Sequence, residues 1–316
     1  MITLSLAATL VAAPTVTRVQ SFDSIRTVAV AGAPTGSLFA VSQENGQVRL
    51  MNAAAKKTVF QLVGHPQPAY GLAFSPDGKL LVTGDETSRI FVWDVKTGKK
   101  LREFPRGQQY HQRGIQALSF TTDGKTLLST GNDDVVFLWD FNKMTVKSRF
   151  AGNGAVFANA TPIKNGIVVA TLVGGLQFRN AHTSAVTAKK DPHTSLGLNE
   201  LAFNASRTKM LSAGRDNGLA VWDTQAQKRL ALLKGHDDWV QHVAISPNGK
   251  LGASSANDRT VVVWDLVGYK KISTLSDQCA VGAPLAFTGD GKFLISVNIN
   301  DGLQINSVSP AQPVGK

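Results

Sequence analysis

The side chains best suited to carry out a reaction are a histidine, a serine and an aspartate that occur together twice at one spacing. The first set is His111, Ser129 and Asp133, and the second is His236, Ser254 and Asp258. In both sets the serine follows the histidine by 18 residues, and the aspartate follows the serine by 4. These three residue types form the nucleophilic triad of many hydrolases. A hydrolase needs its triad once, so the repetition at fixed spacing indicates a structural role.

Other catalytic and ligand-binding motifs are missing from the sequence. It contains no phosphate-binding loop, dinucleotide fingerprint, paired-histidine metal motif or nucleophile elbow. Its one cysteine, Cys279, excludes an internal disulfide and thiolate-rich metal centres. No apolar run is long enough for a transmembrane helix. We therefore expect no catalytic residues, no metal and no cofactor.

The composition is that of a globular protein. Of the 316 residues, 43% are hydrophobic and 17% are charged, and the formal net charge is +11. A basic balance suggests nucleic acid, an anionic surface or an acidic partner. Surfaces that bind single-stranded nucleic acid interleave aromatic and basic residues. Few aromatic residues lie among the basic residues of this sequence, so we do not expect nucleic acid as the partner.

The sequence repeats with a period of about 42 residues. The dipeptide Trp-Asp occurs at four places, which begin at Trp93, Trp139, Trp222 and Trp264. A turn of the type Ser-Pro-Asp-Gly-Lys precedes three of them, with its glycine 15 residues before the tryptophan, at Gly78, Gly124 and Gly249. In the copy that ends at Trp222, Arg207 stands in the glycine position. Extending the register gives seven Trp-equivalent positions, at 51, 93, 139, 179, 222, 264 and 306.

Each copy contains four short β-rich runs separated by turn residues. In this pattern the chain resembles the WD-repeat β-propeller family, on the strength of the Trp-Asp, Gly-His and Ser-Pro-Asp-Gly sequences. The resemblance implies an all-β fold: a single seven-bladed β-propeller with four-stranded antiparallel blades. It also implies that an N-terminal outer strand, expected at 15–21, closes the ring. The expected propeller spans residues 14–308, with a short tail at 309–316.

The family resemblance implies that the repeated polar residues form a structural chain of hydrogen bonds within a blade. The expected members are His65, Thr83, Trp93, His111, Ser129, Asp133, Trp139, Ser212, Asp216, Trp222, His236, Ser254, Asp258 and Trp264. In the second copy Thr87 stands where the aspartate is expected, and in the fifth copy His193 is one residue out of register. Copies one, four and seven lack most members.

Glu200 and His242 occupy equivalent positions on the innermost strands of neighbouring copies. A glutamate and a histidine beside the central channel are able to perform acid–base chemistry. The alternative is a polar contact between blades.

The family resemblance assigns loops to two faces. The top carries the connections between blades and the turns between second and third strands, and the bottom carries the other turns. Top-face candidates for partner binding are Trp239, Tyr70, Gln116, Asn199, Gln241 and Arg215. Trp239 is the strongest candidate because exposed tryptophans anchor many interfaces. The bottom collects a lysine from most of the repeated turns, at Lys79, Lys125, Lys209, Lys250 and Lys292.

Residues 1–13 are apolar and uncharged, as in the hydrophobic part of a signal peptide. Two features count against a signal peptide: no Lys or Arg precedes the apolar run, and Pro14 would follow the cleavage point. The alternative is an ordinary strand or a misassigned start. With a signal peptide the protein is expected in the periplasm or outside the cell, and without one in the cytoplasm.

The function that the sequence favours is that of a non-catalytic scaffold that binds protein partners. We expect a monomeric propeller within a complex of the bacterial cell envelope or an exported complex. The alternatives are an enzyme or small-ligand binder that uses the channel near Glu200 and His242, and a binder of polyanions through the bottom face.

Overall fold

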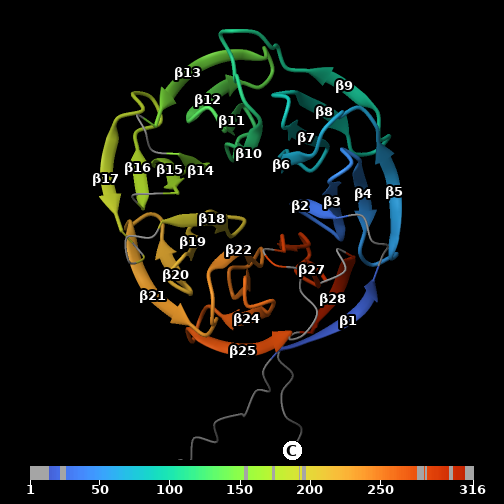
Figure 1. Cartoon of the computed structure of the whole chain (residues 1–316), viewed down its shortest axis with the longest axis vertical. Coiled ribbons are helices and arrows are strands. Elements are labelled where there is room, and N and C mark those ends of the chain that lie inside the picture. The colour runs from blue at the N-terminus through green and yellow to red at the C-terminus, as the bar shows by residue number, and fades with distance from the viewer. Residues whose placement is uncertain are drawn as a thin grey trace, which may run out of the picture.

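The computed structural model forms a ring of seven four-stranded antiparallel sheets, the blades, arranged around a common centre (Figure 1). It describes residues 14–21, 26–152, 156–172, 175–191, 193, 197–275, 281, 283–298 and 302–309. Over these ranges every regular element is a strand. The predicted fold class, an all-β seven-bladed propeller, is confirmed.

Six blades follow the order of the chain from the channel outward. Blade one holds β2 (Thr27–Gly32), β3 (Leu38–Gln43), β4 (Val48–Asn52) and β5 (Lys57–Leu62). Blade two holds β6 (Ala69–Phe74), β7 (Leu80–Asp85), β8 (Ile90–Asp94) and β9 (Lys100–Glu103). Blade three holds β10 (Ile115–Phe120), β11 (Thr126–Gly131), β12 (Val135–Asp140) and β13 (Thr145–Ala151).

The second half of the ring repeats this order. Blade four holds β14 (Phe157–Ile163), β15 (Gly166–Thr171), β16 (Leu176–Arg179) and β17 (Val186–Lys190). Blade five holds β18 (Leu198–Phe203), β19 (Lys209–Gly214), β20 (Gly218–Asp223) and β21 (Lys228–Lys234). Blade six holds β22 (Val240–Ile245), β23 (Leu251–Ala256), β24 (Val261–Asp265) and β25 (Lys270–Leu275). Blade seven holds β26 (Ala286–Phe287), β27 (Phe293–Val297), β28 (Leu303–Ser309) and, from the other end of the chain, β1 (Thr15–Ser21).

The apolar core lies between the blades. The second and third strands of a blade are buried on both faces, as β7 and β8 show, whereas the outer strand β5 alternates between exposed and covered residues. The described residues form seven apolar clusters, and each joins the facing sheets of two neighbouring blades. Because no blade buries its faces alone, each depends on its two neighbours.

The seven Trp-equivalent positions share one place in the blades. Each pairs with the start of the second strand, as in Leu81 with Trp93 and Leu294 with Asn306. Next to each of the seven, the ladder to the outer strand shifts by a β-bulge. The predicted register is therefore confirmed, including the copies where methionine, arginine or asparagine replaces tryptophan.

The interval of 46 residues before Trp139 reflects a longer connection between blades two and three. This connection covers the tryptophan: the ring centroids of Phe104 and Tyr110 lie 5.2 and 5.4 Å from that of Trp139. The additional length thus extends the core at this interface.

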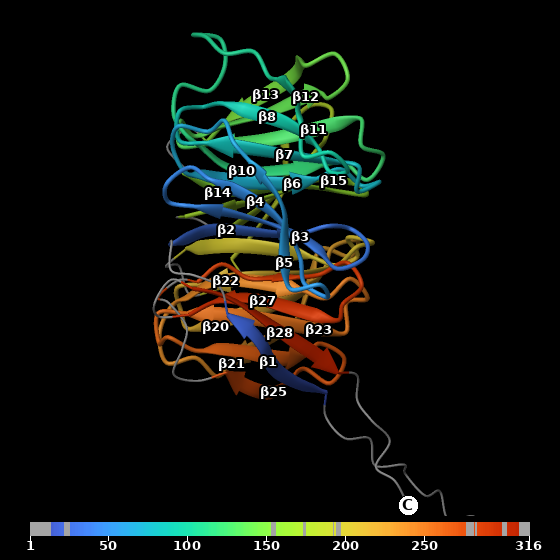
Figure 2. The same cartoon turned by 90° about the vertical axis from the view of Figure 1, so that its right-hand side faces the viewer.

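The ring closes where the two ends of the propeller meet. β1 pairs antiparallel with β28, from Thr15 opposite Ser309 to Ser21 opposite Gln304. Both views show β1 beside β28 (Figures 1 and 2). The predicted N-terminal outer strand is confirmed, and residues 1–13 lie outside the described residues.

Ring closure predicts different effects for two deletions. Removing residues 1–21 takes away β1, exposes the edge of β28 and should lower the midpoint of thermal unfolding, with concentration-dependent association. Removing residues 1–13 leaves β1 in place and should leave the midpoint unchanged. Thermal denaturation followed by circular dichroism, with size-exclusion chromatography, measures both effects. Equal midpoints for the two deletions would contradict the closure argument.

Candidate functional site

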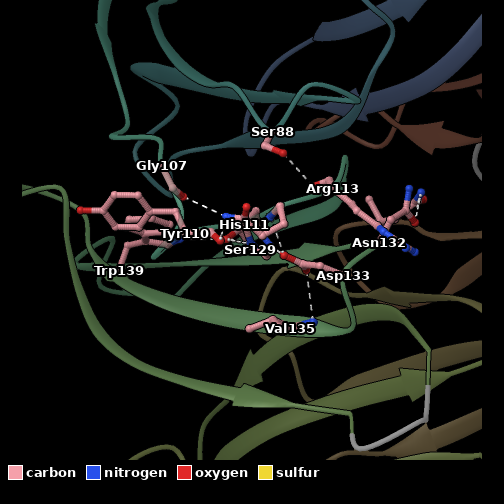
Figure 3. A network of polar contacts seen from close by, with 12 residues as sticks. Ser88, Gly107, Tyr110, His111, Arg113, Ser129, Asn132, Asp133, Val135 and Trp139 are labelled. Atoms are coloured by element: carbon pink, nitrogen blue, oxygen red, sulfur yellow. Dashed lines mark hydrogen bonds and ion pairs between the residues drawn. The ribbon is translucent and has the colours of Figure 1, made fainter.

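The histidine, serine and aspartate of blade three meet in a buried hydrogen-bond network with Trp139 (Figure 3). His111 Nε2 lies 2.7 Å from Ser129 Oγ, and His111 Nδ1 lies 3.0 Å from an Asp133 carboxylate oxygen. Trp139 donates its indole N–H to Ser129 Oγ at 2.8 Å. With Nδ1–H donated to the carboxylate, Nε2 accepts the serine hydroxyl proton. The side-chain polar groups of all four residues thus have partners.

Blade six repeats this geometry. His236 lies 2.7 Å from Ser254 Oγ and 2.8 Å from Asp258, and Trp264 donates to Ser254 Oγ at 2.8 Å. Ser129 and Ser254 are fully buried, so neither hydroxyl is open to a substrate. The arrangement therefore stabilises a blade rather than presenting a nucleophile.

In blade five the network is complete, with His193 as its fourth member. Its ring nitrogens lie 2.7 Å from Asp216 and 3.1 Å from Ser212, whose hydroxyl also accepts the indole N–H of Trp222. The one-residue offset in the sequence therefore does not remove this histidine from the network.

In blade two the aspartate comes from an unexpected position. His65 contacts Thr83 at 2.6 Å and Asp85 at 2.7 Å, and Trp93 donates to Thr83 at 2.8 Å. The expectation that Thr87 leaves this network without an aspartate is wrong: Asp85, two residues earlier, supplies the carboxylate. Thr87 donates its hydroxyl to Asp85 at 2.8 Å and supports it.

Blade seven keeps a reduced form of the network. Asn306, in the Trp position, donates to Ser296 Oγ at 3.0 Å and to the Leu294 carbonyl at 3.2 Å. The corresponding positions hold Met51 and Val41 in blade one, and Arg179 and Val169 in blade four. These two blades lack the buried hydroxyl and its indole donor.

The serine of a complete network predicts a measurable loss of stability. Ser254→Ala leaves His236 Nε2 and the indole N–H of Trp264 buried without their partner, which should cost about 1–3 kcal/mol in the free energy of unfolding. Ser296→Ala is the matched control, because Asn306 keeps its bond to Leu294, and its loss should be smaller. Urea denaturation of both variants measures the difference. A loss for Ser296→Ala that equals or exceeds that for Ser254→Ala would contradict the network's role.

Burial sets the protonation of the network. It lowers the pKa of His193 and His236, against the opposing effect of Asp216 and Asp258. Burial alone would raise the pKa of Asp258, but hydrogen bonds from the Asp237 and Thr260 backbone, the Thr260 hydroxyl and His236 lower it on balance. Both directions mean that the folded protein binds fewer protons than the unfolded chain.

Stability should therefore fall as the solution is acidified. In the unfolded chain His193 and His236 take up protons below their ordinary pKa of 6.5, whereas in the folded protein they stay neutral to lower pH. The free energy of unfolding, measured in urea at pH 7, 6 and 5, should decrease across this series. The double variant His193→Gln, His236→Gln should be less stable at pH 7 but show a shallower decrease. If the free energy of unfolding of the parent protein did not change between pH 7 and pH 5, the conclusion that these histidines stay neutral in the folded protein would be refuted.

The network also positions the top face. Asp258 accepts the backbone N–H of Asp237 at 2.9 Å, which fixes the loop from His236 to Trp239, and the Asn257 N–H bonds to the Trp239 carbonyl at 3.0 Å. Asp133 holds the backbone of Gln112 in the same way, at 2.9 Å. A buried contact thereby orients an exposed loop.

Trp239 lies on the surface, with 41% of its area exposed. The guanidinium of Arg215 lies over its ring, 5.3 Å from the centroid. Arg215 donates to Asn199 at 3.0 Å, and Asn199 donates to the Val240 carbonyl at 2.8 Å. The predicted residues Trp239, Arg215 and Asn199 thus form one cluster across blades five and six.

The other predicted top-face residues share a backbone feature. They are Tyr70, Gln116 and Gln241. Each is the additional residue in a β-bulge of the innermost strand of its blade, and Asn199 has the same place in blade five. Each is coupled to the residue 16 positions later, in a top turn. Gln116 donates to Asn132 at 2.6 Å and Gln241 to Asn257 at 3.0 Å, while burial and the Glu86 carboxylate raise the pKa of Tyr70. A bulge re-aims the side chain of its additional residue, and three of these residues, Tyr70, Gln116 and Asn199, line the channel cavity.

Glu200 and His242 meet in the channel. His242 Nδ1 lies 3.2 Å from Glu200 Oε2, which also accepts the Val243 backbone N–H at 2.8 Å. The pair lines a cavity of about 200 Å³ together with Tyr70, Gln116 and Asn199. The contact joins the innermost strands of blades five and six.

The predicted bottom lysines divide into two kinds. Lys79, Lys125, Lys250 and Lys292 are exposed. Lys209 is half-buried and donates to the Leu266 carbonyl at 2.9 Å. Among the described residues, no three His, Cys, Asp or Glu side chains are grouped to hold a metal ion, and no helix is long and apolar enough to cross a membrane.

Comparison with known families adds to this geometry. The family described as WD domain, G-beta repeat matches residues 56–94, 98–140 and 227–265. These segments cover the β5–β8, β9–β12 and β21–β24 stretches, each ending on a Trp-Asp pair. The chain carries WD40 repeats. Blades four and seven lie wholly outside these matches, yet both are four-stranded and keep the register of the Trp-equivalent position, so the ring is closed beyond the matched segments.

The curated relatives are longer proteins. The chain is 26% identical over 234 residues to the Candida albicans protein named nuclear distribution protein PAC1, which covers 66% of this chain and 45% of that protein. It is 27% identical over 264 residues to the Arabidopsis thaliana protein named cell division cycle 20.1, cofactor of APC complex, covering 80% of this chain and 57% of that protein. This WD40 chain therefore spans about half the length of the relatives it matches.

Proposed function

We propose that this WD40 propeller is a non-catalytic scaffold that binds a protein partner through its top face, on a surface centred on Trp239. The observation that carries the proposal is an exposed tryptophan, stacked under Arg215, on a loop that the buried network of blade six holds in place. Tryptophan and arginine are the residue types most enriched at the energetic centres of interfaces. A fixed loop loses little conformational freedom on binding.

The relatives support an interaction role in general terms. The name of the Arabidopsis thaliana relative describes a cofactor of a complex, which is a property of that protein. We extend to this chain only the expectation that it joins an assembly, as a monomeric propeller.

The cellular location stays a prediction. The expectation of export, and with it of a bacterial envelope assembly, rests on residues 1–13, which lie outside the described residues. The relatives named above come from a fungus and a plant and add no support to it. Fusion of residues 1–20 to a reporter enzyme would show whether this segment directs secretion.

The alternative function uses the channel as a ligand or catalytic site. In its favour, Glu200 and His242 lie 3.2 Å apart in a cavity. Against it, the oxygen that faces His242 also accepts the Val243 N–H, so the pair has a role in joining the strands. The scaffold proposal therefore has the better support.

Trp239→Ala should remove the partner without unfolding the propeller. Affinity purification of the tagged protein from its native host, with quantitative mass spectrometry, should identify a partner whose recovery falls at least tenfold in this variant. Truncating a tryptophan at the energetic centre of an interface costs about 2 kcal/mol or more, which exceeds the roughly 1.4 kcal/mol of a tenfold change.

Tyr269→Ala is the matched control, since Tyr269 is an aromatic residue of the same blade with 39% exposure, on the bottom face. Its recovery of the partner should equal that of the parent protein. Equal recovery by Trp239→Ala would refute the top-face proposal. Loss of recovery in Glu200→Gln, with Trp239→Ala unaffected, would favour the channel.

A further inference from the structure

The bottom mouth of the channel opens into a second, larger cavity of about 590 Å³. Its walls are the lower ends of the innermost strands and the turns that follow them. Half-buried Phe74 and Phe203 and the rings of Pro34, Pro76 and Pro247 make much of this lining apolar. Among its lining residues, all within the described part of the chain, one carries a formal charge: Arg207.

Arg207 occupies a backbone position that the neighbouring repeats give to glycine. Its N–H bonds to the carbonyl three residues before it, Asn204 O, and the same bond is made at Gly78, Gly124, Gly249 and Gly291. Those glycines have φ angles of 68–70°, and Arg207 has φ 53°. A side chain is disfavoured in this left-handed region. The fifth repeat therefore has a long cationic side chain at a turn position where four other repeats have glycine, which has no side chain.

The guanidinium points toward blade four. Arg207 Nη1 donates to the Pro162 carbonyl at 2.6 Å. Blade four turns from Ile163 to Gly166 through two residues, whereas the equivalent turn in blade two has five, Ser75 to Lys79. The short turn leaves a gap in the bottom rim, a neighbouring cavity of about 510 Å³ that Arg207 also lines.

No carboxylate of the described residues forms an ion pair with Arg207. Burial lowers its pKa to about 10, so it is charged at neutral pH. One acidic residue, Asp123, lines the neighbouring cavity, but its carboxylate already accepts bonds from Thr121 and from the Lys125 backbone. A guanidinium offers five donors in a planar fork that fits a carboxylate. Part of that capacity remains for a ligand.

We infer that the bottom mouth binds an acidic peptide segment of a partner protein, with a carboxylate on Arg207 and an apolar side chain against the phenylalanines and prolines. The exposed lysines of the surrounding turns, Lys79, Lys125, Lys250 and Lys292, favour the approach of such a segment. In a peptide that alternates acidic and apolar residues, an acidic side chain can pair with Arg207 while its apolar neighbours contact the phenylalanine and proline rings. This site is separate from Trp239 and does not depend on the top-face proposal.

The test is fluorescence anisotropy with a labelled hexapeptide that alternates glutamate with phenylalanine and leucine, titrated with the full chain. The parent protein should bind, and replacing the glutamates with glutamine should raise the dissociation constant at least tenfold. Arg207→Gly should raise it by a similar factor. This variant restores the turn glycine, so it should fold normally, and its thermal midpoint provides the check.

Arg259→Gly is the matched control. Arg259 is an exposed arginine in a top-face turn with φ 63°, so this variant makes the same chemical change on the opposite face. It should bind the peptide like the parent protein. The inference is overturned if the glutamate peptide does not bind the parent protein, or if Arg207→Gly binds it as tightly as the parent. It is also overturned if a thymidine oligonucleotide binds in an Arg207-dependent manner and the peptide does not.

Discussion

A buried hydroxyl that serves an imidazole and an indole at once is the interaction on which the regular blades depend. In blade six, Ser254 sits on the second strand, Trp264 on the third, Asp258 in the top turn and His236 in the connection from the preceding blade. Four separate segments of chain are therefore tied to one point. Because the hydroxyl, the imidazole and the indole are buried, losing one partner leaves the others unsatisfied, and the network acts as a unit.

Blades one, four and seven lack all or part of this network and rely on their neighbours. Met51 and Phe39 of blade one pack against Ile295 and Ile305 of blade seven, in a cluster that crosses the closure of the ring. On the other side of the ring, Val168 and Phe178 of blade four pack against Trp222 of blade five. A closed ring distributes stability in this way, since every blade has a partner on both faces and β1 leaves β28 without a free outer edge.

The fold was predictable from the sequence because each repeat carries the same few turn and core residues. Period and register followed from the Trp-Asp pairs and the Asp-Gly turns, and they placed even Asn306 correctly. The individual side chains were less predictable. Asp85 reaches His65 from a strand end two residues before the expected place, and a fixed count along the chain cannot show that convergence in space. The sequence also could not show that Tyr70, Gln116, Asn199 and Gln241 are bulge residues, because a bulge is set by pairing between strands.

Repeat proteins separate the residues that hold the frame from those that differ between copies. A side chain that recurs at one register, such as the serine of the network, is buried and has the same structural role in each blade that carries it. Where one copy departs from the rest, the departure needs its own explanation. Trp239 is exposed on a loop that the frame holds rigid, and Arg207 keeps a left-handed backbone conformation that its neighbours assign to glycine. We propose that both residues are retained for a contact outside the repeat, because neither belongs to the network that the blades share.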